Sequence, residues 1–358
     1  MQIDKVSSER LSVLRFPLII GVVFIHAYGT EVGFSNGVVG VTNTGYWVDF
    51  CRDLISQGIA RVAVPLFFLM SGYFFFLGFS FSVNNYKTKV KSRLSTLLIP
   101  FLFWNILTLC LIALAQYLPA TQSFFSGKNA QISTFGIYDY FNALFGIDRS
   151  PISYQFWFIR DLMVMILIAP AIYLFLNKAS KVVLFTIFTL WFLNVWPIYI
   201  PSAAAFAFFY AGAYFAHSNT NIFALDRFGP LILLLYLVTL LIDTSTKGYV
   251  FNEYIHHAGI LLGIGSALFV TNAVVKTAYL KKALMWASGC SFFVFAVHEP
   301  LLTVMRKISY KMLQPNNDLL ALSLYLIIPF FVIALSMLAY MAIKSIAPKF
   351  LSVISGGR

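Results

Sequence analysis

The chain has 358 residues, of which 60% are hydrophobic and only 11% are charged. This composition excludes an ordinary soluble domain, in which about a quarter of the residues are charged, and it indicates a membrane protein with several spanning helices. The net charge of +12 does not indicate nucleic-acid binding, because the basic residues of membrane proteins gather in cytoplasmic loops.

Apolar runs recur along the chain, each near the length of about 20 residues that a spanning helix needs. They predict an all-α protein with about ten transmembrane helices, at residues 11–30, 58–80, 95–117, 156–176, 182–199, 202–217, 229–243, 255–275, 286–305 and 319–343. Basic clusters at 87–93, 177–181 and 276–282 favour placing both termini in the cytoplasm. We expect a single integral-membrane domain over residues 1–358 and no additional soluble domain.

The first predicted helix contains the stretch RFPLIIGVVFIH, which begins at Arg15 and ends at His26. Helical geometry places these two residues on the same face, within roughly 20° of each other around the helix axis and about 16 Å apart along it. Arg15 could simply anchor the helix by reaching water, and His26 could simply form a hydrogen bond between helices. His26 could instead be a general base, because imidazole titrates near neutral pH and can accept a hydroxyl proton.

Two later helices also carry polar pairs. His298 and Glu299 lie in the outer half of the helix at 286–305, where ionisable residues predict a functional site, although a structural contact between helices is the alternative. Arg160 and Asp161 are consecutive, and consecutive helical positions do not share a face, so they are expected to serve different partners. Arg160 could bind substrate or anchor the helix.

No spacing of a metal site is visible. The cysteines Cys51, Cys110 and Cys290 are far apart and match neither a disulfide framework nor a metal site. The adjacent His256 and His257 lack a third ligand. We therefore expect no metal.

The stretch RLSVLRFPLIIGVVFIHAYG resembles the opening of acyltransferase family 3, whose members carry a basic residue and a histidine separated by ten positions. Arg15 and His26 match that spacing. Four later segments resemble the family in its own order: Arg61 to Phe75, Lys91 to Asn105, Phe156 to Pro170 and Ser291 to Leu302. One departure concerns the donor site, because members often carry two arginines three positions apart, whereas here Arg93 is followed at that spacing by Thr96.

The resemblance implies a multi-pass protein of the bacterial inner membrane that transfers an acyl group, commonly acetyl, from cytoplasmic acyl-CoA to a hydroxyl of an envelope glycan or lipid-linked sugar. His26 would deprotonate this hydroxyl, or it would carry the acyl group as a covalent intermediate. Its expected partners are acyl-CoA, the sugar acceptor and membrane lipids, with neither metal nor nucleic acid. The residues expected at the site are Arg15 and His26 for catalysis, Lys89, Lys91 and Arg93 for the coenzyme A phosphates, and Arg61, Trp157, Arg160, His298 and Glu299 for the acceptor.

Two other functions fit the sequence. A secondary transporter for an anionic metabolite would also place Arg and His on a path through the membrane, although no internal repeat is visible. A scaffold protein of glycan synthesis without chemistry of its own would not need His26.

Overall fold

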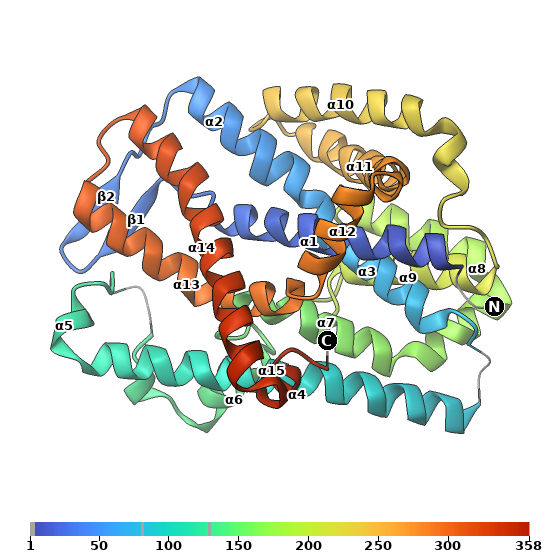
Figure 1. The fold of residues 1–358 in the computed structure, drawn as a ribbon, viewed down its shortest axis with the longest axis horizontal. Helices are drawn as coiled ribbons and strands as arrows, with labels where there is room; N and C mark the ends of the chain where they lie inside the picture. The colour runs from blue at the N-terminus through green and yellow to red at the C-terminus, as the bar shows by residue number, and fades with distance from the viewer. Residues whose placement is uncertain (1–3, 80–81, 128–129, 358) are drawn as a thin grey trace. The chain divides into compact units, whose positions relative to one another are not determined.

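Figure 1 shows the computed structural model, which describes residues 4–79, 82–127 and 130–357. The last residue of the helix predicted at 58–80 lies outside these ranges. The contacts within the chain define two compact units. Unit 1 comprises Met1–Val22, Asp53–Leu97 and Phe158–Ser291, and unit 2 comprises Val23–Arg52, Leu98–Trp157 and Phe292–Arg358.

All the regular secondary structure in the described part of unit 1 is helical. Its helices are α1 (Lys5–His26), α3 (Ala63–Phe76), α4 (Val83–Tyr117), α7 (Trp157–Leu167), α8 (Ala169–Phe192), α9 (Ala203–His217), α10 (Gly229–Ser245), α11 (Asn252–Lys276) and α12 (Ala278–Ser288). The ends of α1 and α4 continue into unit 2. A π-helix at Asp53–Gly58 and a 3₁₀ helix at Ile59–Val62 lead into α3, and a 3₁₀ helix at Ala224–Phe228 leads into α10.

Unit 2 adds further helices and one short hairpin. Its helices are α2 (Tyr46–Arg52), α5 (Pro119–Gln122), α6 (Ile137–Phe145), α13 (Ser291–Leu313), α14 (Asp318–Ile346) and α15 (Pro348–Ile354), with 3₁₀ turns at Ile132–Thr134 and Tyr154–Phe156. The antiparallel strands β1 (Glu31–Phe34) and β2 (Gly37–Gly40) pair Glu31 with Gly40. Apart from this hairpin the described elements are helices, which confirms the predicted all-α class.

Six helical segments among the described residues are long and apolar enough to cross a membrane. They are Tyr46–Phe76, Val83–Tyr117, Ala169–Phe192, Ala224–Ser245, Asn252–Lys276 and Asp318–Ile346, and the bent pair α12 and α13 makes a seventh if it is one span. The chain is therefore a multi-pass membrane protein. The predicted first span, α1, is not among the six, since Glu9, Arg10 and Arg15 interrupt its apolar run.

The helix boundaries between 156 and 199 differ from the prediction. The predicted helix at 156–176 is divided, because α7 ends at Leu167 and α8 begins at Ala169, with Pro170 in its first turn. Proline is favoured there, since its missing N–H is not needed at a helix start. The polar stretch at 177–181, predicted to be a loop, lies inside α8 and bends it at Ala179, whose φ and ψ are −150° and 37°.

Helices α3 and α9 of unit 1 approach each other at two glycines (Figure 1). A Cβ atom added at Gly72 would lie 2.0 Å from the Phe209 carbonyl oxygen, and one added at Gly212 would lie 1.9 Å from the Leu69 carbonyl oxygen. Small residues allow such close contact between membrane helices, where dispersion contacts take the place of hydrophobic burial.

In unit 2, the C-terminal part of α13 holds the hairpin loop (Figure 1). Arg306 Nη2 donates to the carbonyl oxygens of Gly29 at 2.7 Å and Glu31 at 3.2 Å. Lys307 Nζ donates to the carbonyl oxygens of Gly33, at 3.1 Å, and Phe124. Cationic side chains thus fasten the chain that directly follows His26.

Candidate active site

His26 is the last residue of α1, and two rings of unit 2 surround it. The ring of Tyr154 meets it edge-on at a centroid distance of 4.8 Å, with an interplanar angle of 77°. The ring of His298 lies nearly parallel to it, at 5.3 Å and 29°. His26 is half-buried, whereas His298 is fully buried. The structure therefore brings His26 and His298 into ring contact.

A break in α13 sets the position of His298. Pro300 has no N–H to donate to the carbonyl of Ala296, and it disfavours the helical conformation in the residue before it. Glu299 accordingly has φ and ψ of −111° and 133°. Gln155 supplies the missing donor, because its Nε2 binds the carbonyl oxygens of Ala296 at 3.2 Å and Glu299 at 3.1 Å.

The hydrogen bond of His298 fixes its tautomer. Its Nδ1 lies 2.7 Å from the carbonyl oxygen of Phe295, and because a carbonyl only accepts, Nδ1 carries the proton. His298 Nε2 and Gln155 Oε1 are buried and have no hydrogen-bond partner among the residues that the structure describes. In a neutral imidazole and an amide, these two atoms are acceptors, which a hydroxyl group would satisfy.

The Glu299 carboxyl group is held by two hydroxyl groups of the same unit. The Tyr154 hydroxyl donates to Oε1 at 3.1 Å, and the Thr303 hydroxyl donates to Oε2 at 2.8 Å. Although Tyr154 exposes 39% of its surface, its hydroxyl is turned towards Glu299. Burial of this hydroxyl, reinforced by the Glu299 charge, raises the pKa of Tyr154 well above its usual value, so the phenol remains a donor at neutral pH.

A cluster of cations occupies unit 1. Arg93 lies close enough to Arg15 and Lys89 for its charge to act on both. Lys89 Nζ also donates to the carbonyl oxygen of Phe75 at 2.6 Å, and Lys91 is exposed. Within residues 4–79, 82–127 and 130–357, these four cations form no ion pair with a carboxylate. Like charges gathered without a counter-ion favour the binding of an anion.

Arg160 pairs with its neighbour Asp161, so the expectation that the two serve different partners is wrong. The guanidinium donates to Asp161 Oδ1 from Nε at 3.0 Å and from Nη2 at 2.9 Å, and it lies over the ring of Tyr199. Asp161 Oδ2 accepts the N–H of Ser202 at 2.8 Å, just before α9. A long guanidinium can fold back to the adjacent residue although the two Cβ atoms diverge. These contacts make the buried pair part of the packing of α7 and α9.

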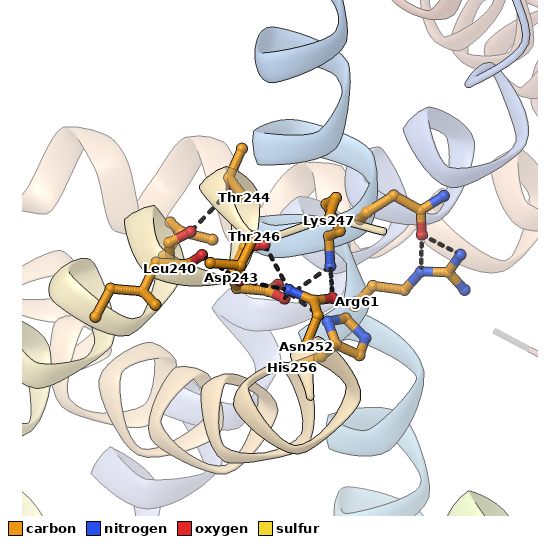
Figure 2. Close-up of polar contacts among 10 residues, drawn as sticks. Arg61, Leu240, Asp243, Thr244, Thr246, Lys247, Asn252 and His256 are labelled. Carbon is orange, nitrogen blue, oxygen red and sulfur yellow. Dashed lines mark hydrogen bonds and ion pairs between the residues drawn. The ribbon is translucent and has the colours of Figure 1, made fainter. Parts of the chain in front are cut away.

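Arg61 lies beside a polar network at the adjoining ends of α10 and α11, as Figure 2 shows. Its Nε donates to Gln57 Oε1 at 2.9 Å. The network is centred on the buried Asp243, whose carboxyl group accepts three hydrogen bonds: from Lys247 Nζ at 2.7 Å, Asn252 Nδ2 at 3.0 Å and His256 Nδ1 at 3.1 Å. These bonds tie the two helices together. His256 and His257 have different partners, since the Nδ1 of His257 bonds to the Phe192 carbonyl oxygen.

The predicted site residues thus fall into separate groups within the two units. His26, His298 and Glu299 come together in unit 2, and Arg15, Lys89 and Arg93 come together in unit 1. Arg61 and Arg160 belong to other contacts of unit 1, and Trp157 is the half-buried first residue of α7. Among the described residues, no three His, Cys, Asp or Glu side chains are grouped to hold a metal ion.

Sequence reasoning missed two residues of the site, Tyr154 and Gln155. Both are uncharged, and both lie in a short 3₁₀ turn before α7. The sequence did contain an indirect signal, because a proline inside an apolar helix leaves a carbonyl that needs a donor from elsewhere. It did not indicate which donor.

Comparison with known proteins adds a family match. Residues 9–341 match a family described as an acyltransferase domain. The chain is 27% identical to the succinoglycan biosynthesis protein ExoH of Rhizobium meliloti (strain 1021), over 98% of this chain and 92% of that protein. No solved structure matches the chain.

Proposed function

The chain belongs to acyltransferase family 3, and from that premise we propose that it moves an acyl group from cytoplasmic acyl-CoA to a hydroxyl of a bacterial envelope glycan or lipid-linked sugar. The proposal includes a place in the inner membrane, ten spans and both termini in the cytoplasm. It treats residues 1–358 as one functional domain. The similarity to a succinoglycan biosynthesis protein supports a polysaccharide acceptor.

The observation that carries the proposal is the contact of His26 with the rings of Tyr154 and His298. In the proposed reaction, the His26 imidazole takes the proton of the acceptor hydroxyl. The oxygen of that hydroxyl attacks the thioester carbonyl at the same time. The carbon–sulfur bond then breaks, and the imidazolium returns the proton to the departing thiolate. The negative end of the α1 helix dipole, where His26 lies, stabilises the imidazolium that forms.

The cation cluster of unit 1 supports a coenzyme A site. Arg15, Lys89, Lys91 and Arg93 would bind the phosphate groups by charge-assisted hydrogen bonds. We assign Arg15 to this role and the general-base chemistry to His26.

The test is transfer by the purified full chain in detergent. The protein is incubated with labelled acetyl-CoA or succinyl-CoA and with glycan extracted from the envelope of the source bacterium. Label that moves to the glycan supports the enzyme and identifies the acyl group. Label that enters liposomes containing the protein, without transfer to glycan, would instead support the transporter.

Arg93→Gln should raise the KM for acyl-CoA about tenfold, because one charge-assisted contact with phosphate is lost. S-acyl-pantetheine lacks the nucleotide phosphates, so the variant and the unchanged protein should use it equally well. Lys178→Gln, in another basic cluster, is the control and should leave both KM values unchanged. Equal loss with both donors would contradict a role in phosphate binding.

Tyr154→Phe should lower the rate of transfer about tenfold, because the Glu299 carboxyl group loses one of its two hydroxyl donors. The measurement is kcat with saturating acyl-CoA and glycan. Tyr140→Phe removes a hydroxyl that binds the Ile132 carbonyl elsewhere in unit 2, and it should leave kcat unchanged. A full rate in Tyr154→Phe would show that this hydrogen bond is not needed for the reaction.

A further inference from the structure

Helix α12 begins at Ala278, directly after α11 ends at Lys276 and Thr277 caps it. Because α11 is one of the segments that can cross the membrane, α12 starts at the depth where the chain leaves the lipid. With 11 residues, α12 is about 17 Å long and too short to cross a membrane by itself. Its position and length are those of a helix at the boundary between lipid and water.

One face of α12 carries large side chains that the protein leaves uncovered. Tyr279, Lys282 and Trp286 follow one another at spacings of three and four positions, so they share this face. Tyr279 exposes 80% of its surface and Trp286 exposes 59%. Such side chains are favoured at the membrane interface, where the ring lies against acyl chains and its polar group reaches the headgroups.

The opposite side of α12 is fixed to unit 1. Ala287 is buried, and Lys281 Nζ forms an ion pair with Glu9 Oε2 of α1 at 2.6 Å. These contacts orient the helix, so that the face of Tyr279 and Trp286 is turned away from the rest of the unit.

The charges that flank this face in the sequence are all positive. Between Glu253 and Glu299 the chain has no acidic residue, whereas Lys276 and Lys282 are both exposed. Among the residues that the structure describes, neither lysine forms an ion pair with a carboxylate. Lysines at a membrane surface attract anionic headgroups, and in the proposed orientation these two lie at the cytoplasmic leaflet.

We propose that α12 lies in the membrane interface and binds anionic phospholipid through its exposed face. Tyr279 and Trp286 reach the upper part of the acyl chains, and Lys276 and Lys282 bind the phosphate groups of the headgroups. Charge complementarity and the continuity of α12 with the span α11 select lipid as the occupant of this face. The inference does not depend on acyl transfer.

The first part of the test measures depth. An NBD fluorophore is attached to Ala283→Cys, an exposed position between Tyr279 and Trp286, after Cys51 and Cys110 are replaced by alanine and with the buried Cys290 retained. The full chain is reconstituted in liposomes of phosphatidylcholine and phosphatidylglycerol. A doxyl nitroxide near the headgroup should quench NBD more strongly than one near the end of the acyl chain. Stronger quenching by the deep nitroxide, or no quenching by either, would overturn the proposal.

The second part compares phosphatidylglycerol with phosphatidylcholine, each carrying the nitroxide near the headgroup. Quenching gives the relative association constant of the anionic lipid at α12. We expect a value of about 5 to 30, since each lysine near a membrane surface contributes roughly a factor of five. Replacing Lys276 and Lys282 together with glutamine should reduce the value to about 1.

Lys178→Gln combined with Lys181→Gln is the matched control, because these lysines form another exposed basic pair of unit 1, within α8. The control should leave the association constant at α12 unchanged. Equal association of the two lipids with the unchanged protein would refute anionic selectivity. A loss in the control as large as that in the test variant would show that net charge, and not the α12 surface, attracts the lipid.

Discussion

Replacing His26 with alanine should lower the rate of acyl transfer by about 10² to 10⁴-fold, the usual contribution of a general base. The imidazole at the end of α1 is the only base in our mechanism that reaches the acceptor hydroxyl. The measurement is the initial rate of label transfer from acyl-CoA to glycan by the purified variant. Its unfolding temperature in detergent should stay close to that of the unchanged protein, because His26 is only half-buried.

His217→Ala is the matched control, since His217 is likewise the last residue of a helix and likewise contacts a tyrosine ring, that of Tyr173. It should transfer at the full rate. A normal rate in folded His26→Ala would refute the proposed mechanism and favour a scaffold role. If acyl groups were trapped on His26 in the absence of acceptor, the reaction would follow the covalent route and not direct transfer.

Gly212→Ala should destabilise the protein by more than about 3 kcal/mol, although alanine favours helix over glycine. The added Cβ would lie 1.9 Å from the Leu69 carbonyl oxygen and 2.7 Å from the Tyr73 nitrogen. Both are main-chain atoms, so no side-chain rotation relieves the clash and α3 and α9 must separate. The measurement is the yield of monodisperse protein and its unfolding temperature in detergent.

Gly259→Ala makes the same chemical change where space exists. The added Cβ would meet only the Thr239 methyl group, at 3.6 Å, which is an ordinary contact. This variant should be as stable as the unchanged protein or slightly more stable. If Gly212→Ala proved equally stable, the close approach of α3 and α9 would be wrong.

The fold was predictable where long apolar runs dominate the sequence. Long apolar runs predicted the helices, but they could not fix how the helices divide. The stretch at 177–181 is polar enough to suggest a loop, yet it bends α8 at Ala179 without ending it. The hairpin of β1 and β2 had a local signal, since Asn36 and Gly37 follow an alternating run, but a four-residue strand is short for recognition.

The site was predictable where ionisable groups occur in apolar surroundings. His26, His298 and Glu299 met that criterion, and the structure brings them together within unit 2. Gln155 did not, because its role arises from the Ala296 carbonyl that Pro300 leaves without a donor. Arg306 did not either, because its hydrogen bonds to the Gly29 and Glu31 carbonyl oxygens come from tertiary packing.

The attachment of the hairpin loop to α13 involves carbonyl oxygens and not side chains at Gly29, Glu31, Gly33 and Phe124. Every amino acid supplies the same carbonyl, so substitutions in this loop leave its anchorage intact. The loop's side chains can therefore change while Arg306 and Lys307 keep the segment in place.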